Sequence, residues 1–247
     1  MISKEELVEL KQKRGLNLYY LEKEYLQYVF LSAISKYGDS IIFKGGTCLR
    51  ICYGLERASE DLDFSCELGV SKLKEVVKIC LKSFDFLGIE SFDLIEKEFE
   101  GNVRFEVRFK GPLFNGNLNS ANNLKIDFNK NKVFFKSAKV IKQEFSDVST
   151  FVLVVLSEKE ILAEKIRAIV NRKQARDLYD LWILIGKNVE IDKGLIKKKL
   201  KEEKVNLKNI QLISKEAYEQ DLRNLINYVP SYEQVKKEVE KLLCELT

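Results

Sequence analysis

The sequence predicts an α+β fold in which a mixed β-sheet flanked by helices is followed by a helical C-terminal subdomain. Three observations lead to this prediction. The N-terminal stretches 3–14 and 18–37 carry apolar side chains at helical spacing. Strand-like segments then dominate residues 92–151. Beyond Ser157 the pattern is helical again to the end of the chain.

Helices and short strands alternate in the first ninety residues. Asn17 is placed to cap the second helix. A buried apolar strand then runs directly into a glycine turn, and a strand with period-two alternation follows. The predicted elements after residue 37 are a strand at 41–43, a turn at 44–47, a short helix at 48–53 closed by Gly54, a strand at 61–66 and a helix at 71–87.

β-branched and aromatic residues cluster in the segments that should form the rest of the sheet. These predicted strands, in an antiparallel or mixed sheet, are 106–109, 124–128, 132–135 and 151–156. Ser157 and Glu160 then match an S-x-x-E capping box that opens a helix ending near Val170. A helix at 174–187 and a lysine-rich pair or trio of helices, with a turn at Pro230, complete the chain.

The change from strand-like to helical sequence patterns near residue 156 divides the chain into two predicted domains. Residues 1–156 would form a catalytic core with N-terminal helices, and residues 157–247 a helical subdomain that completes the active site. No apolar stretch is long enough to span a membrane, and the N-terminus is charged, so we expect a cytoplasmic protein without a membrane partner. The five scattered cysteines are expected to be reduced.

The chain contains no histidine. This absence excludes Ser-His-Asp and Cys-His nucleophile systems and histidine-based zinc sites. Catalysis would have to use carboxylates, lysine, arginine, hydroxyls or a hard metal ion. The net charge of +4 is too small to indicate nucleic-acid binding by itself.

Asp61 and Asp63 stand two apart on a predicted strand, so their carboxylates project from the same face. Two like charges at this distance destabilise each other unless a cation lies between them, and Mg²⁺ or Mn²⁺ is the natural choice for oxygen ligands. Asp127 is a third candidate ligand, because apolar neighbours on both sides point it away from the core. A bare D-x-D tripeptide is more often a solvated strand face, so the assignment depends on its context.

The glycine turn upstream supplies that context. Gly45 and Gly46 allow the backbone to approach a phosphate closely, and the hydroxyl of Thr47 could donate to it. The turn alone could be an ordinary tight turn. It is not a Walker A motif, which disfavours a P-loop NTPase.

Two long runs resemble a known family. FKGGTCLRICYGLERASEDLDF, residues 43–64, resembles motif I of the AbiEii/AbiGii abortive-infection toxin nucleotidyltransferases, which belong to the DNA polymerase β-like superfamily. SEKEILAEKIRAIVNRKQARDLYDL, residues 157–181, resembles their later motif E-K-x-x-A-x-x-x-R-x-x-x-R-D-x-x-D. The resemblance spans about residues 17–185. It departs from the family pattern at Cys48, where a small residue such as alanine is commoner, and the lysine-rich tail matches no known pattern.

The resemblance implies a polymerase β-like core and a set of site residues. The metal ligands would be Asp61, Asp63 and Asp127, the last also a possible base, and Asp177 would complete the catalytic set. Lys165 would contact the triphosphate, while Asp180 and Arg176 would be architectural. The nucleotide-binding residues would be Lys44, Gly45, Gly46, Thr47 and Lys165. Without the resemblance, Lys165 and Arg167 would be interpreted as a solvated helix face.

The resemblance also implies a reaction and its partners. An acceptor hydroxyl would attack the α-phosphorus of a nucleoside triphosphate (NTP) in the presence of Mg²⁺ or Mn²⁺. The acceptor would be RNA, in particular the 3′ end of tRNA, and the protein would be the toxin of a toxin–antitoxin system with a separately encoded antitoxin. Basic residues at 193–208, with seven lysines against two glutamates, and at Arg104, Arg108 and Lys110 offer limited support for RNA binding.

Two alternatives stay open at this point. The acceptor could be a protein hydroxyl, in which case labelled nucleotide would appear on protein. The chain could also be a non-catalytic nucleic-acid-binding module on the same fold. The presence of every predicted catalytic side chain argues against the second alternative.

Overall fold

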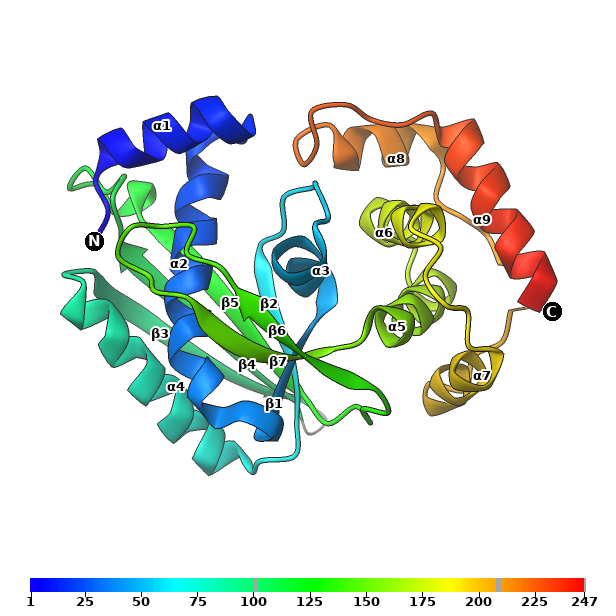
Figure 1. Cartoon of the computed structure of the whole chain (residues 1–247), viewed down its shortest axis with the longest axis horizontal. Coiled ribbons are helices and arrows are strands. Elements are labelled where there is room, and N and C mark those ends of the chain that lie inside the picture. The colour runs from blue at the N-terminus through cyan, green and yellow to red at the C-terminus, as the bar shows by residue number, and fades with distance from the viewer. Residues whose placement is uncertain (100–101, 208–209, 247) are drawn as a thin grey trace. The chain divides into compact units, whose positions relative to one another are not determined.

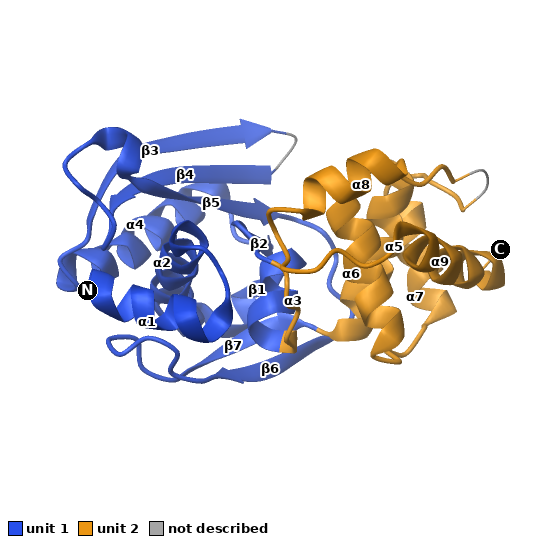
Figure 2. Ribbon diagram, turned by 90° about the horizontal axis from the view of Figure 1, so that it is seen from above, with its two compact units in different colours: residues 1–52, 58–156 blue, residues 53–57, 157–247 orange. Residues whose placement is uncertain are grey.

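The computed structural model describes residues 1–99, 102–207 and 210–246 (Figure 1). The chain divides into two compact units (Figure 2). Unit 1 comprises Met1–Cys52 and Ala58–Leu156, and unit 2 comprises Tyr53–Arg57 and Ser157–Thr247. The short segment Tyr53–Arg57, which lies within the first motif, is therefore part of unit 2.

Unit 1 begins with two helices that carry their own start signals. Ser3 accepts a hydrogen bond from the backbone N–H of Glu6 at 3.1 Å, and Asn17 accepts one from that of Tyr20 at 2.9 Å. The predicted cap at Asn17 is thus confirmed. The helical segments that begin in this unit are α1 (Lys4–Arg14), α2 (Leu18–Ile34), η1 (Ser35–Ser40), α3 (Gly45–Tyr53), α4 (Val70–Phe86) and η2 (Leu118–Ser120).

The sheet of unit 1 has the strand order β3-β4-β5-β2-β1-β7-β6. Its strands are β1 (Ile41–Lys44), β2 (Asp61–Cys66), β3 (Glu90–Phe99), β4 (Asn102–Lys110), β5 (Asn122–Asn129), β6 (Lys136–Ile141) and β7 (Phe151–Leu156). β2 and β5 are parallel, as are β1 and β7, and the other neighbours are antiparallel. The predicted mixed sheet flanked by helices is confirmed.

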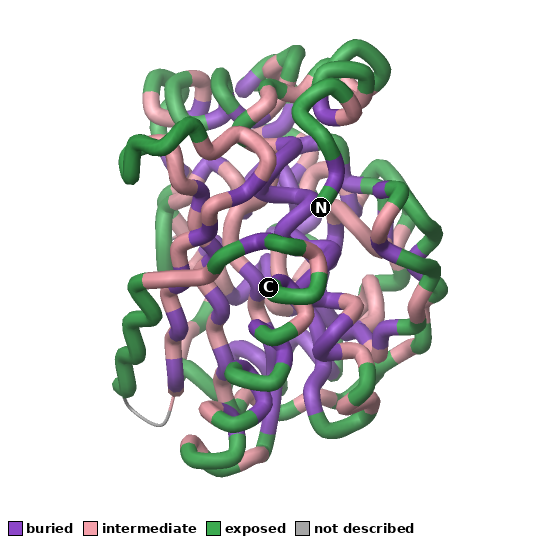
Figure 3. Tube along the Cα trace, turned by 90° about the vertical axis from the view of Figure 1, so that its left-hand side faces the viewer, coloured by how far each residue is buried: buried purple, intermediate pink, exposed green. Residues whose placement is uncertain are grey.

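Period-two alternation gives this sheet two different faces. One face is apolar and packs against α2 and α4, as Figure 1 shows. Its aromatic core includes Phe64, whose ring stacks on that of Phe128 with 5.2 Å between centroids and lies 5.3 Å from that of Phe43. Burying each such ring contributes about 1.5–3 kcal/mol. Buried and half-buried positions alternate along β4 and β5 (Figure 3). The half-buried positions of β2, β4 and β5 carry the charged residues of the other face.

The strand predicted at 132–135 is wrong. Residues 130–135 are irregular, and β6 begins only at Lys136. The reason is the topology: this segment must connect β5 to β6, which are separated by β2, β1 and β7. Four inter-strand spacings amount to about 19 Å, so the six residues have to run across the strands and cannot pair alongside one.

Unit 2 is helical apart from its connections. The helices are α5 (Glu158–Asn171), α6 (Ala175–Gly186), α7 (Lys193–Glu202), α8 (Lys215–Leu222) and α9 (Tyr232–Leu246). The described part of the tail thus contains a trio of helices, and Pro230 lies just before the last of them. None of the helices in the described part of the chain combines the length and apolarity needed to cross a membrane.

The predicted capping box at the start of α5 is wrong. Ser157 occupies the N-cap position, but its side chain makes no capping hydrogen bond, and its buried Oγ has no partner. The Oε1 atom of Glu160 lies 2.7 Å from the Nζ of Lys199 on α7. Both of these side chains are fully buried, so this ion pair fixes α7 against α5 instead.

Candidate active site

The turn between β1 and α3 is shaped around a glycine. Gly45 has φ +79°, which L-residues other than glycine rarely adopt. A Cβ built on Gly45 would lie 2.3 Å from Oδ2 of Asp63, far inside contact distance. The glycine therefore brings the β1–α3 backbone directly against the Asp63 carboxylate.

The three candidate aspartates lie on one face of two neighbouring strands. Asp61 and Asp63 are two apart on β2, and Asp63 is directly opposite Asp127 of the parallel strand β5. On the other side, Lys44 of β1 is opposite Asp63. The structure thus aligns Lys44, Asp63 and Asp127 in one row across the sheet, with Asp61 two residues before Asp63 on the same face. All three carboxylates are half-buried.

Asp127 has a cationic partner that the sequence analysis did not assign. Arg104 of β4 lies opposite Asp127, and its Nε and Nη2 donate to the two carboxylate oxygens at 2.7 and 3.0 Å. This bidentate geometry is the strong form of a charge-assisted hydrogen bond. The hydrogen bond to Asp127 raises the pKa of Arg104 above its usual value, and the charge of Asp61 adds to the effect.

The donor chemistry of this row suits a divalent cation. All its candidate ligands are carboxylate oxygens, which Mg²⁺ and Mn²⁺ prefer, and Mg²⁺ commonly binds one or two protein carboxylates together with substrate phosphates. Within the described residues, no three His, Cys, Asp or Glu side chains are grouped so that they could already hold a metal ion. The arrangement therefore fits an ion held by Asp61 and Asp63, with Asp127 available once Arg104 releases it.

Thr47 is fully buried at the start of α3. Its hydroxyl donates to the backbone carbonyl of Asp61 at 2.5 Å and lies 2.9 Å from the hydroxyl of Ser59. These contacts tie α3 to the beginning of β2. The predicted contacts of Gly46 and Thr47 with phosphate stay predictions.

The segment that leads into β2 is held by a buried glutamine that the sequence analysis did not mention. Gln27 of α2 donates from Nε2 to the carbonyls of Ser59 and Glu60, both at 3.0 Å. Lys23, one turn earlier, is buried and donates to Asn123 of β5. Burial lowers the pKa of Lys23, and the neighbouring charges of Glu60 and Asp61 oppose that effect.

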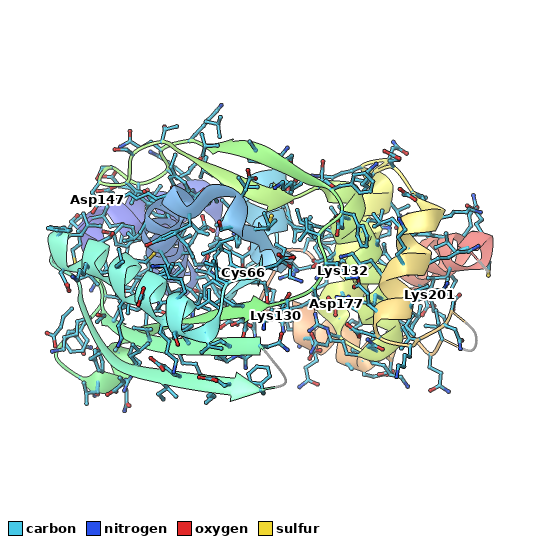
Figure 4. All side chains as sticks on the ribbon, turned by 90° about the horizontal axis from the view of Figure 1, so that it is seen from below. Cys66, Lys130, Lys132, Asp147, Asp177 and Lys201 are labelled. Carbon is cyan, nitrogen blue, oxygen red and sulfur yellow. The ribbon has the colours of Figure 1, made fainter. Side chains whose placement is uncertain are left out.

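The other two predicted site residues belong to a charge cluster in unit 2. Lys165 of α5 is 7% exposed, and its Nζ lies 2.8 Å from Oδ1 of Asp177 and 2.6 Å from Oδ2 of Asp180. Arg172 also binds Asp177, at 2.8 and 3.2 Å. Figure 4 labels Asp177, which lies in the first turn of α6. Burial disfavours the charged lysine, but the charges of Asp180 and Asp177 outweigh it and raise the pKa of Lys165.

Asp180 has a second partner from the first motif. Arg57 donates from Nε and Nη2 to its two carboxylate oxygens at 2.6 and 2.7 Å, with both side chains almost fully buried. Burial would raise the pKa of Asp180, but Arg57 and Lys165 together lower it. This contact joins residues 123 apart and explains why an arginine precedes S-E-D in the first motif.

The family model of the AbiEii toxin nucleotidyltransferases of type IV toxin–antitoxin systems matches residues 29–240. A comparison with curated proteins finds no match. Among solved structures, the chain is similar to MenT4, a nucleotidyltransferase toxin from Mycobacterium tuberculosis H37Rv, with TM-score 0.72, 18% identity, and coverage of 100% of this chain and 90% of that one. It is also similar to JHP933 from Helicobacter pylori, with TM-score 0.62, 23% identity, and coverage of 94% and 93%.

The match covers both motifs quoted above, and the two solved structures share the fold, so the predicted resemblance is confirmed. The chain belongs to the AbiEii family of nucleotidyltransferase toxins, enzymes that use an NTP and are paired with an antitoxin.

Proposed function

We propose that this protein transfers a nucleoside monophosphate from an NTP to the 3′-terminal hydroxyl of tRNA. The acceptor oxygen forms a bond to the α-phosphorus, the bond from that phosphorus to the bridging oxygen breaks, and pyrophosphate leaves with the electron pair. The observation that carries the proposal is the packing of the Gly45 backbone against Asp63, in a row that also includes Asp127. This packing brings the backbone at Gly45 next to the carboxylates of the row.

The proposal assigns Asp61, Asp63 and Asp127 to a divalent cation, Mg²⁺ or Mn²⁺. When bound, this ion would supply electrostatic stabilisation of the charge that develops on the phosphate oxygens. Asp127 can instead accept the proton of the acceptor hydroxyl, because its carboxylate faces the same side of the sheet as Asp63. Either role requires Arg104 to turn away from it.

The backbone and side chains of residues 44–47 bind the triphosphate in this proposal. Gly45 places no side chain beside the Asp63 carboxylate, so the backbone N–H groups of Gly45 and Gly46 would meet the phosphate oxygens. Lys44, opposite Asp63, supplies positive charge.

The proposal also assigns a part of the reaction to the helical unit. Lys165 would contact the triphosphate, and Asp177 would hold the lysine in position. The 2.8 Å ion pair between Lys165 and Asp177 supports the second role. Asp180 binds both Arg57 and Lys165 and so helps to keep that pair in place.

The biological consequence follows from the acceptor. A tRNA that carries an extra nucleotide at its 3′ end cannot be aminoacylated, so translation stops in the cytoplasm where this reaction is proposed to occur. An antitoxin then has to restrain the enzyme, as expected for a member of this family.

The test is to incubate the purified protein with Mg²⁺, total tRNA and each α-³²P-labelled NTP in turn, and to resolve RNA and protein products separately. We expect label from at least one NTP in tRNA, and no label when the metal is chelated. Label only in protein would show that the acceptor is a protein hydroxyl, and label in neither would contradict the proposal.

A further inference from the structure

The connection between β5 and β6 carries positive charge that the site described above does not use. Residues 130–142, KNKVFFKSAKVIK, contain five lysines and no acidic residue. Lys130, Lys132 and Lys136 are exposed, and the rings of Phe134 and Phe135 are 38% and 39% exposed. Lysines interleaved with exposed aromatic rings are typical of surfaces that bind single-stranded nucleic acid.

This segment begins three residues after Asp127 and ends level with Asp63. Figure 4 shows Lys130 and Lys132 following the end of β5, the strand that carries Asp127. At the other end, Lys136 is opposite Leu156 of β7, and the pairing of β7 with β1 places this position level with Lys44 and Asp63. Three inter-strand spacings separate Lys136 from Asp63, which is about 14 Å between Cα atoms.

A cavity of about 440 Å³ lies between the segment and the sheet of unit 1. Its lining includes Ile42 and Ser65 from the strands, Asn131, Phe134 and Lys136 from the segment, and the two carboxylates Asp39 and Glu67. Ser65 is two residues after Asp63 on the same strand face. An aromatic ring, a primary amide and a hydroxyl are the groups that stack on a nucleobase and bond to its edge.

The basic residues of β4 and one lysine of α7 use their charge within the protein. On β4, Arg104, Arg108 and Lys110 each form an ion pair with a carboxylate of β5 or β3, at 2.7, 3.3 and 2.7 Å. On α7, Lys199 is fully buried against Glu160. Lys136 of the segment likewise forms an ion pair, with Asp39 at 2.8 Å. The sequence had favoured the stretches on β4 and α7 for RNA contact, whereas residues 130–136 combine exposed lysines, exposed rings and a cavity in one place.

We propose that residues 130–136 and the cavity beneath them bind the single-stranded end of the RNA acceptor, with Lys130, Lys132 and Lys136 at its phosphates and Phe134 against a base. This inference rests on the proposed function, because it supplies the track by which an RNA end reaches Asp63. The lysines provide sequence-independent attraction to the backbone, and the cavity orients the terminal nucleotides.

The first test removes the charge. The triple variant K130A/K132A/K136A is compared with K4A/K78A/K82A, which loses the same charge from exposed lysines of α1 and α4. Affinity for a short fluorescein-labelled single-stranded RNA is measured by anisotropy over a salt series, after thermal melts show both variants folded. Loss of three phosphate contacts should lower the slope of log K against log salt by about 2, and the control should keep the wild-type slope.

The second test removes the stacking ring. Phe134→Ala is compared with Phe86→Ala, a ring on α4 that is 90% exposed. Loss of one stacked base should weaken RNA binding about 5- to 150-fold in the first variant only. In steady-state transfer, the KM for RNA should rise while the KM for the NTP stays unchanged.

Two results would overturn the inference: a triple variant that binds RNA with the wild-type affinity and salt slope, or a rise in the KM for the NTP with the KM for RNA unchanged. The second result would assign the cavity to the nucleotide donor. The RNA-binding measurements do not require nucleotide transfer, so they test the RNA site independently of the proposed reaction. If the lysines carry RNA binding but wild-type protein transfers no nucleotide to RNA, the proposed function fails and the RNA site stands.

Discussion

Replacing Gly45 with alanine should disable the site while the protein stays folded. Gly45 has φ +79°, and Gly116, in a loop of the same unit, has φ +92°. An alanine at either position would have to adopt the left-handed backbone region, which costs about 1–2 kcal/mol for an L-residue. The two glycines differ in their surroundings, because a Cβ on Gly116 would meet nothing within 4 Å, whereas one on Gly45 would lie 2.3 Å from Oδ2 of Asp63.

The effect on the reaction can be worked from that distance. An ordinary contact begins at 3.4 Å, so the Asp63 carboxylate, the turn or both must move by 3.4 − 2.3 = 1.1 Å in Gly45→Ala. A displacement of about 1 Å between reacting groups can lower a rate on the order of 10²-fold. Gly116→Ala should lose similar backbone stability and keep its activity.

The assay is kcat/KM for nucleotide transfer at saturating metal, with urea denaturation of both variants. We expect both to unfold at lower urea than the wild type, and Gly45→Ala alone to lose about two orders of magnitude in kcat/KM. Equal activity in the two variants would refute the reasoning that the Gly45 turn shapes the Asp63 site.

Asp63→Asn should abolish transfer with an unchanged thermal melting temperature; activity within a few-fold of the wild type would exclude Asp63 from the metal site. Asp180→Ala leaves two buried cations without their shared carboxylate and should cost about 3–5 kcal/mol in urea denaturation, and a loss below 1 kcal/mol would argue against the buried cluster. Arg104→Gln frees Asp127 and should raise the affinity for Mn²⁺ several-fold by isothermal titration; weaker Mn²⁺ binding would contradict the competition between arginine and metal. For pH, burial would raise the pKa of Asp177, but Lys165 and Arg172 lower it to about 2 from the ordinary value of 3.8. Because this pKa is depressed in the folded state, about 2 kcal/mol of stability is present above pH 3.8 and lost as the pH falls through 2. Melting temperatures of the wild type and Asp177→Asn should therefore converge between these values; a constant difference would contradict the assignment.

Local patterns were sufficient to predict most elements of the fold. Period-two alternation in DLDFSC and LKIDF gave strands whose aspartates share a face, and Gly45 and Gly54 both adopt the positive φ that a turn requires. Such signals depend only on neighbours in the sequence. The family resemblance added the expectation that the two strands belong to one core.

Contacts between residues that are distant in the sequence could not be predicted from these local patterns. KVFF has strand composition, but its residues cross the sheet because β5 and β6 are four strands apart. Ser157 and Glu160 match a capping box, but Glu160 is taken by Lys199 from a distant helix. The spacing of residues gives no information on which partner a charged side chain finds.

The same limit applies to the site. The aspartates could be predicted because each one sits on a recognisable strand, whereas the Arg104 partner of Asp127 depends on the register between β4 and β5. The contact of Arg57 with Asp180 joins residues that are 123 positions apart in the sequence. In the sequence, the position of Arg57 within the first motif was the one indication of a structural role.

The measurement that tests the central claim most directly is the stoichiometry of the reaction. Pyrophosphate release and nucleotide incorporation into tRNA are followed in the same sample with the wild type and Asp63→Asn, and the modified RNA is mapped by mass spectrometry. We predict equal amounts of pyrophosphate and incorporated nucleotide, an addition at the 3′ end and no product from Asp63→Asn. Nucleotide consumption without any mass added to RNA, or full activity of Asp63→Asn, would contradict the account.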